Sequence, residues 1–245
     1  MRKTSIIIPT YNGIQVLRDC IYSIRRHTTH QPIEIIVVDN GSTDGTADFC
    51  LQERISFLSL PDNRGFPTAC NYGLAMASGD ALLLLNNDII VTTNWLDHLL
   101  RCLDSQGDIG IVGPVTNYAS GPQQITEPFT HVDDMAERYN RQDPAKWQET
   151  RRLVGLCFLM KREVYEQLGG LDERFSPGHF EDDDYCLRAR QAGYRLMIAG
   201  DVFIFHHGSQ SFTREGEASV KELIARNKAK FMEKWGVDPE TFIHA

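Results

Sequence analysis

Residues 5–12, Ser5-Ile6-Ile7-Ile8-Pro9-Thr10-Tyr11-Asn12, combine a β-branched apolar run with an abrupt change to polar and turn-forming residues. The isoleucines predict a strand over 6–8, and apolar residues at helical spacing predict a helix over 14–24. The same order repeats, with strands over 33–38, 55–60, 81–85 and 109–112 and helices over 44–51, 66–77 and 95–103. Asp44 and Asn94 stand where they can cap the second and fourth helices. This alternation predicts an α/β fold with a doubly wound, mostly parallel sheet and right-handed crossovers.

The second half of the chain has a different texture. Residues 114–150 are polar and contain a single short helical candidate over 134–141, which is typical of a functional loop. An apolar strand over 153–160 and helices over 163–168 and 181–192 follow. A last helix, predicted over 220–235, has an apolar stripe and a basic face, which indicates either a solvated surface or a contact with an anionic membrane. The basic residues of that face are Lys221, Arg226, Lys228, Lys230 and Lys234.

Composition excludes several classes of protein. The 245 residues include 25 Lys+Arg and 33 Asp+Glu, a formal charge of −8 that argues against a nucleic-acid partner. The longest apolar run is shorter than the roughly 20 residues of a transmembrane helix, and the start of the chain lacks the apolar core of a secretory signal. We therefore expect a cytoplasmic protein without a transmembrane segment. The six cysteines are scattered and form no CxxC pair, which predicts buried, reduced thiols.

Polar residues follow four of the predicted strands. They are 9–12, 39–42, 62–65 and 86–88. Turn chemistry favours Asn, Asp and Gly at any one of these places, but four together at the carboxyl ends of parallel strands predict a binding cleft. The chain contains no G-x-G-x-x-G, no P-loop and no G-x-S-x-G motif, which argues against a dinucleotide dehydrogenase, a P-loop enzyme and an α/β-hydrolase.

Asn86-Asn87-Asp88 follows four consecutive leucines. If the backbone stays extended, Asn86 and Asp88 lie on one side and Asn87 lies on the other. A carboxylate and an amide oxygen on one side suit a divalent cation such as Mg²⁺ or Mn²⁺, which completes its shell with water and phosphate oxygens. The alternative is an Asx turn that ends the strand.

Residues 181–184 place four carboxylates in a row at the start of a predicted helix. Helical spacing puts Asp182 at the head of a small, apolar stripe that should pack inward, whereas Asp183 and Asp184 should be solvated or paired. A partly desolvated carboxylate is suited to general-base work at neutral pH, so Asp182 is a candidate base. The alternative is an acidic helix cap. Later in the chain His206 follows an apolar run, where it is either a metal ligand or a core residue.

These motifs, in this order, resemble the inverting nucleotide-sugar glycosyltransferases of family 2, which have the GT-A fold. The resemblance runs from 5–12 through 37–44, 63–66, 71–73 and 85–88 to 180–184. It implies a single GT-A domain over 1–245, with a Rossmann-like nucleotide-sugar-binding half (1–113) and an acceptor-binding and catalytic-base half (114–245).

The resemblance also implies roles for individual residues. Asp182 corresponds to the catalytic base of the family's acidic pair, with Glu181 beside it. Asp88 corresponds to the metal ligand of the D-x-D-type motif, and His206 to the histidine that completes the metal shell. One position departs from that motif, because Asn86 stands where an aspartate is usual. The residues expected at the nucleotide are Pro9, Thr10, Tyr11, Asn12, Asp39, Asn63, Arg64, Asn71 and Asn87.

The expected reaction is inverting transfer of a sugar from a UDP- or dTDP-sugar to an acceptor hydroxyl, with Mn²⁺ or Mg²⁺ as cofactor. The acceptor is expected to be a glycan, a protein or a lipid-linked molecule met at the inner face of the membrane. Its recognition should fall on residues 114–150 and the loop after His206. Two alternatives remain: a nucleotide-sugar-binding module without catalysis, and a sugar nucleotidyltransferase.

Overall fold

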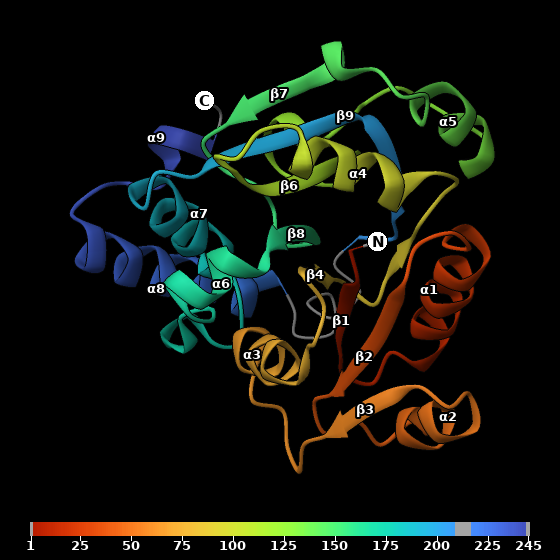
Figure 1. Cartoon of the computed structure of the whole chain (residues 1–245). Helices are drawn as coiled ribbons and strands as arrows, with labels where there is room; N and C mark the ends of the chain where they lie inside the picture. Colours follow the sequence, from red (N-terminus) through yellow and green to blue (C-terminus); the bar gives the residue numbers. More distant parts are fainter. Residues whose placement is uncertain (1, 209–216, 244–245) are drawn as a thin grey trace.

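The structure is a computed structural model that describes residues 2–208 and 217–243 (Figure 1). Its helices are α1 (Ile14–His27), α2 (Thr46–Gln52), α3 (Phe66–Met76), α4 (Trp95–Asp104), α5 (Val132–Tyr139), α6 (Arg162–Leu168), α7 (Glu181–Gln191), α8 (Glu217–Trp235) and α9 (Glu240–Ile243). Its strands are β1 (Thr4–Thr10), β2 (Ile33–Asp39), β3 (Ser56–Ser59), β4 (Ala81–Leu85), β5 (Ile89–Ile90), β6 (Ile109–Thr116), β7 (Trp147–Thr150), β8 (Cys157–Lys161) and β9 (Arg195–His206). The predicted α/β order is therefore present.

Within the described residues the strands form one sheet of nine, in the order β3-β2-β1-β4-β8-β6-β9-β5, with β7 paired to β9. Strand β1 pairs in parallel with β2 and β4, and β2 pairs in parallel with β3. Strand β8 runs antiparallel to both of its neighbours, β4 and β6. The predicted doubly wound sheet is confirmed as mostly parallel, and the antiparallel exceptions lie beyond β4.

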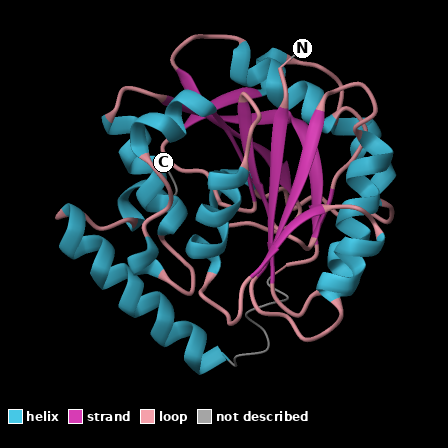
Figure 2. Cartoon of the chain, turned by 60° about the horizontal axis from the view of Figure 1, so that its bottom comes forward, coloured by secondary structure: helices cyan, strands magenta, loops and turns pink. Residues whose placement is uncertain are grey.

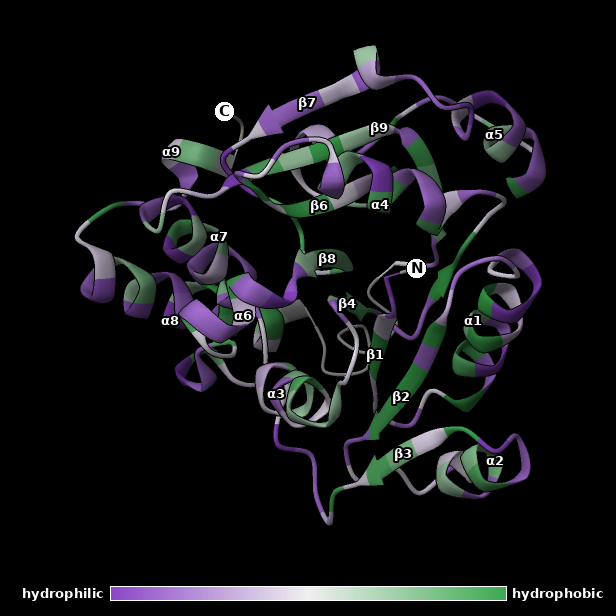
Figure 3. Cartoon of the chain, in the orientation of Figure 1, coloured by the Kyte–Doolittle hydropathy of each residue, from purple (hydrophilic) through white to green (hydrophobic). Residues whose placement is uncertain are grey.

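Alternate residues of β1 face two helical layers. Ile6 and Ile8 belong to a buried cluster with Leu17 of α1, whereas Ile7 belongs to a second cluster with Leu74 of α3 and Tyr185 of α7. Figure 2 shows the strands as a central layer with helices on both sides. Figure 3 shows apolar residues along strands such as β2 and β6, whereas β7 is largely polar. A strand buried on both faces needs a continuous apolar run, which explains the three consecutive isoleucines.

The two predicted helix caps differ from the structure. Asn94 occupies the N-cap position of α4, but its side chain makes no capping hydrogen bond there. The N-cap of α2 is Gly45, and the Asp44 carboxylate accepts instead from the backbone N–H groups of Thr46 (3.2 Å) and Ile14 (2.9 Å). Asp44 thereby lies beside the first residues of both α1 and α2.

Three strands were not predicted, namely β5, β7 and the 12-residue β9, and one predicted strand is shorter than expected. β5 has two residues, and β7 has the polar sequence Trp-Gln-Glu-Thr, so neither carries a readable apolar pattern. The strand predicted over 153–160 begins only at Cys157. Residues 153–156 do not pair with a neighbouring strand. Instead the N–H of Gly155 and the carbonyl of Leu156 form hydrogen bonds with residues of the candidate site.

The basic face predicted for the last helix lies at the surface, because Lys221 and Arg226 are exposed and the other cations are partly exposed. Four of its basic residues donate hydrogen bonds to carbonyl or carboxylate groups of this chain: Arg226, Lys228, Lys230 and Lys234. On the same helix Phe231 is buried against Phe175 and Phe242. Folding brings acidic and carbonyl groups that are distant in sequence onto α8, so this helix closes one end of the molecule.

The structure also bears on the cysteines and on the helix hydropathy. All six cysteines are buried and free, as predicted. Across residues 2–208 and 217–243, none of the helices combines the length and the hydropathy that crossing a membrane requires.

Candidate active site

Polar side chains at the carboxyl ends of β1 and β4 are joined at one edge of the sheet. The amide nitrogen of Asn87, just beyond β4, donates to the hydroxyl of Thr10, the last residue of β1 (2.8 Å). The backbone N–H of Asn40, just beyond β2, donates to the Thr10 carbonyl (2.8 Å). The structure therefore brings three of the four predicted strand exits together.

Asp39 ends β2 with a buried carboxylate that is 1% exposed. One of its oxygens accepts from the backbone N–H of Ser42 (2.9 Å) and the other from the hydroxyl of Ser59 (2.8 Å). Each carboxylate oxygen keeps one further acceptor position, because an ionised carboxylate can accept about four hydrogen bonds. Next to it, the Asn12 side-chain oxygen accepts from the backbone N–H of Thr43 (2.8 Å).

The loop over 62–65 belongs to the same edge. The Asn40 amide donates to the side-chain oxygen of Asn63 (2.8 Å) and accepts from the backbone N–H of Arg64 (2.9 Å). The Arg64 side chain is exposed and pairs with Asp62, and Tyr11 is also exposed, so both are accessible from solvent. Pro9 is buried within β1.

Two contacts connect this edge to the second half of the chain. The backbone N–H of Phe66 donates to the Pro177 carbonyl (2.8 Å), and a Cβ at Gly65 would lie 2.8 Å from the Pro177 Cα. The Asn71 side chain accepts from the backbone N–H of Leu171 (2.8 Å) and donates to the carbonyl of the same residue (2.9 Å). Asn71 thus joins α3 to the segment that precedes α7, and its nucleotide contact stays a prediction.

The extended backbone assumed for 86–88 is wrong. Asn87 and Asp88 form a turn between β4 and β5, so side-chain alternation does not apply there. The short strand β5 that follows pairs antiparallel with β9, with Ile89 opposite His206, and the backbone N–H of His207 donates to the Asp88 carbonyl (3.1 Å). This unpredicted pairing is what brings Asp88 and His206 together.

Asp88 and His206 form a buried pair, 5% and 7% exposed. The Nε2 of His206 lies 3.2 Å from an oxygen of Asp88, and its Nδ1 lies 2.8 Å from the carbonyl of Tyr118. Burial lowers the pKa of His206, but the hydrogen bond to Asp88 and the charge of that carboxylate outweigh it, so the pKa lies above its usual value.

The donor set of this pair fits a divalent cation. Because only a donor N–H can face the Tyr118 carbonyl, a neutral His206 directs its Nε2 lone pair at the Asp88 carboxylate, and a positive charge is needed between them. Either a proton or a metal ion supplies it. Within residues 2–208 and 217–243 no cluster of three or more His, Cys, Asp or Glu side chains is placed to hold a metal. Two protein ligands are nonetheless enough for Mg²⁺ or Mn²⁺ when water and phosphate oxygens fill the other positions.

Asp182 lies at the start of α7 and is half-buried, with both carboxylate oxygens held by backbone N–H groups. One oxygen accepts from Gly155 (2.8 Å) and the other from Asp183 (2.9 Å). The residue after Gly155, Leu156, accepts through its carbonyl from the backbone N–H of Asn86 (2.9 Å). Two adjacent residues therefore connect Asp182 to the turn that carries Asp88.

The other carboxylates of the row are more buried than Asp182, which contradicts the solvated alternative for Asp183 and Asp184. Asp183 pairs with Arg152, and burial followed by the charge of Asp182 raises its pKa. Burial, again followed by the charge of Asp182, raises the pKa of Glu181 well above its usual value, and one oxygen of Glu181 is buried without a hydrogen-bond partner. A neutral Glu181 beside an accessible Asp182 is consistent with this environment.

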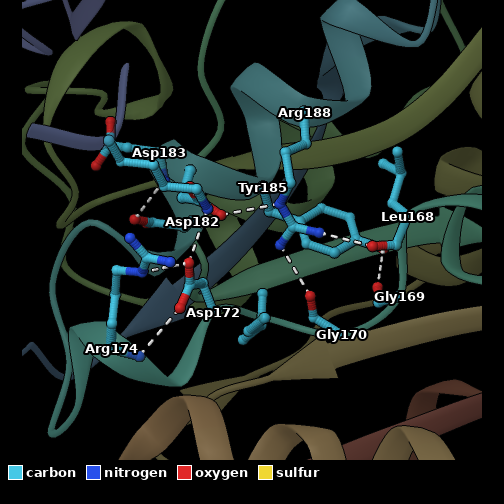
Figure 4. A network of polar contacts seen from close by, with 12 residues as sticks. Leu168, Gly169, Gly170, Asp172, Arg174, Asp182, Asp183, Tyr185 and Arg188 are labelled. Carbon is cyan, nitrogen blue, oxygen red and sulfur yellow. Dashed lines mark hydrogen bonds and ion pairs between the residues drawn. The ribbon is translucent and has the colours of Figure 1, made fainter. Parts of the chain in front are cut away.

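Asp184 is fully buried and anchors α7 to its surroundings. Its carboxylate pairs with Arg188 (2.9 Å) and Lys234, and it accepts from the indole N–H of Trp235 (2.9 Å). Arg188 in turn donates to the carbonyls of Leu168 and Gly170, as Figure 4 shows. This network fixes the helix that carries Asp182, and it links that helix to α8.

We expect Asp184→Ala to lower the free energy of unfolding by about 3 kcal/mol, because it removes the buried carboxylate shared by Arg188, Lys234 and the Trp235 indole, although Lys234 keeps Asp172 as a second partner. Urea denaturation followed by circular dichroism measures the loss. The matched control is Glu240→Ala, which removes an exposed partner of Lys228 and should cost no more than about 1 kcal/mol. Equal losses in the two variants would contradict a structural role for the Asp184 network.

Sequence reasoning missed the residues that hold the candidate ligands in place. The Asn117 side chain accepts from the backbone N–H of His206 and donates to its carbonyl, and the Tyr118 carbonyl contacts the His206 ring. Both lie in the irregular segment 114–150, which carries no pattern that predicts this. Gly155 could have been noticed from the sequence, because it interrupts the apolar run over 153–160. Part of the loop after His206, proposed for acceptor recognition, lies outside the described residues.

The family "Glycosyl transferase family 2" matches residues 5–169. Among solved structures, the mannosyltransferase PcManGT from Pyrobaculum calidifontis, in complex with GDP-Man and Mn²⁺, matches with a TM-score of 0.70 and 20% identity over 95% of this chain and 64% of that one. This likeness confirms the GT-A fold.

Two curated relatives match most of this chain but only part of themselves. The uncharacterised protein y4gI of Sinorhizobium fredii is 27% identical over 94% of this chain, and the O-antigen biosynthesis protein RfbC of Myxococcus xanthus is 28% identical over 85% of it. The chain spans only 27% and 18% of the lengths of these two relatives.

Proposed function

This chain belongs to glycosyl transferase family 2, and we propose that it moves a sugar from a nucleoside-diphosphate donor to an acceptor hydroxyl with inversion at the anomeric carbon. The observation that carries the proposal is the junction at Gly155 and Leu156. Through it the carboxylate of Asp182 and the turn that bears Asp88 are bound to adjacent backbone groups. The candidate base and the candidate metal-binding carboxylate are thus held by neighbouring residues of one segment.

We assign donor binding to the edge formed by β1, β2 and the loop over 62–65. Asp39, Asn12 and Asn63 offer carboxylate and amide groups there for a base and a ribose, and the exposed Arg64 offers a cation for phosphate. Parallel sheets bind ligands at this edge, which supports the assignment. UDP or dTDP remains our preferred donor nucleotide, although PcManGT holds GDP-Man.

Asp182 is the proposed base. Its two backbone donors orient the carboxylate while leaving it half-exposed, so an acceptor hydroxyl can reach it. As the acceptor oxygen bonds to the anomeric carbon, its proton passes to Asp182 and the bond to the nucleoside diphosphate breaks on the opposite face. One displacement of this kind inverts the anomeric configuration and needs no covalent intermediate.

Asp88 and His206 are the proposed ligands of a divalent cation. When Mn²⁺ or Mg²⁺ is bound there, it neutralises negative charge that develops on the departing diphosphate. The Mn²⁺ in the PcManGT complex supports this choice of metal. Asn117 and Tyr118 hold the His206 ring so that its Nε2 faces Asp88.

Donor-dependent release of a nucleoside diphosphate is the test of the proposed function. A panel of UDP-, dTDP- and GDP-sugars with Mn²⁺ should first identify a donor by thermal shift. A ligand at about 100 times its Kd adds about 2.7 kcal/mol of stability and raises Tm by about 5–10 °C. The identified donor and a hydroxyl acceptor should then release nucleoside diphosphate and give a product with the inverted anomeric bond.

Other outcomes of the same assay identify the alternatives. Release of pyrophosphate would identify a sugar nucleotidyltransferase. A thermal shift without any release, across glycan, peptide and lipid-linked acceptors, would favour a binding module without catalysis. A product that retains the donor's anomeric configuration would contradict direct displacement by one base.

A further inference from the structure

A cavity lies at the opposite end of α7 from Asp182. It has a volume of about 280 Å³ between the last turn of α7 and the paired strands β7 and β9, and its lining includes Arg151, Arg190 and Arg195. Asp182 and Arg190 are eight residues apart on one helix, which is about 12 Å along its axis. The cavity is therefore separate from the candidate active site.

Three arginines and one carboxylate line this cavity, and the carboxylate is already paired. Glu149 lies 2.9 Å from Arg195, which also lies 3.7 Å from Asp108. Arg151 is exposed, and Arg190 is partly buried with its guanidinium 5.9 Å from the centre of the Phe242 ring. Within the part of the chain that the structure describes, neither Arg151 nor Arg190 forms an ion pair with a carboxylate.

The two arginines without an acidic partner also repel each other. Burial, followed by the charge of Arg151, lowers the pKa of Arg190. The same helix shows the usual alternative, since Arg188 is partly buried as well but binds Asp184. Two like charges beside one cavity raise the free energy of the empty state, and an anion that enters removes that cost.

We propose that Arg151 and Arg190 bind a phosphate group in this cavity, as a second site apart from glycosyl transfer. A guanidinium presents N–H donors in a planar fork that matches phosphate oxygens, which makes arginine the usual residue for such recognition. The volume is near the lower limit for small-molecule sites and accommodates a phosphate with part of its substituent. The phosphate belongs either to a soluble phosphorylated molecule or to a lipid headgroup.

Calorimetric titration of the whole chain with inorganic phosphate tests the site. The double variant R151Q/R190Q should bind phosphate about ten- to hundredfold more weakly, because charge-assisted hydrogen bonds are lost. The variant R151K/R190K keeps the charge without the fork and should lie between the two. The matched control R101Q/R138Q removes two exposed arginines elsewhere and should bind phosphate like the parent.

Flotation with phosphatidylcholine vesicles that contain phosphatidate distinguishes the two sources. If the parent floats and R151Q/R190Q does not, the occupant is a lipid headgroup. If the parent binds inorganic phosphate but does not float, the occupant is soluble. The proposal is overturned if the parent binds neither probe, or if R151Q/R190Q binds phosphate like the parent. Because these readouts are binding measurements, they are independent of whether the proposed transfer reaction is correct.

Discussion

An Asp182→Asn variant should transfer sugar about 10²–10⁴-fold more slowly than the parent while binding the donor with similar affinity. The amide keeps the size of the side chain and one acceptor oxygen, so it retains one of the two backbone hydrogen bonds from Gly155 and Asp183, but it cannot take a proton from the acceptor. Single-turnover rates at saturating donor measure the loss. Thermal shift with the nucleoside diphosphate shows that donor binding is retained.

Glu181→Gln is the matched control for this experiment. Glu181 is the neighbouring carboxyl, and it is buried. Burial, followed by the charge of Asp182, raises its pKa and so favours the neutral form that glutamine mimics. We expect a far smaller loss of rate than in Asp182→Asn. If Glu181→Gln lost as much rate and Asp182→Asn turned over normally, the role of base would move from Asp182 to Glu181.

Asp88→Asn should lower the transfer rate by about 10²–10³-fold, with a weaker dependence on added Mn²⁺. The substitution removes the carboxylate that faces His206, so the proposed cation site loses its negative charge. Chelation should abolish transfer by the parent, and Mn²⁺ should restore it in the parent but not in the variant. Rates measured across a Mn²⁺ titration separate weaker metal binding from a slower step at saturation.

Asp80→Asn supplies a control on the same strand. Asp80 and Asp88 flank β4 at its two ends, so both substitutions remove one negative charge, but only Asp88 follows the carboxyl end. The Asp80 variant should keep its Mn²⁺ dependence and most of its rate. A parent enzyme that retains full activity after chelation would exclude a metal role for Asp88 and His206.

Local pattern was enough to predict every element of the first half except β5. The isoleucines of β1 and the leucines of β4 are buried on both faces, so composition alone indicates a central strand. The polar strand exits followed from the geometry of parallel sheets, and Thr10 and Asn87 meet at that edge. Pattern works here because the continuous apolar run of a strand buried on both faces can be recognised without knowing which strands pair with it.

The wrong predictions for residues 86–88 and for Asp184 share one physical cause: the local structure there depends on partners that are distant in sequence. Strand β5 exists because β9 pairs with it, and that pairing, not alternation along 86–88, places Asp88 beside His206. Asp184 is buried because Lys234 and Trp235 arrive from α8, 50 and 51 residues away. A row of four acids contains no information about such partners.

The contacts of Gly65 with Pro177 and of Asn71 with Leu171 bear on how new enzymes could be made from this one. These contacts connect residues 1–113 to residues 114–245, so neither part can be exchanged for that of another enzyme without regard to the other. A chimera joined near residue 113 would pair the contact surface at 64–71 from one parent with the contact surface at 171–177 from another. Exchange of residues 114–245 should succeed only when residues 64–71 and 171–177 come from the same parent.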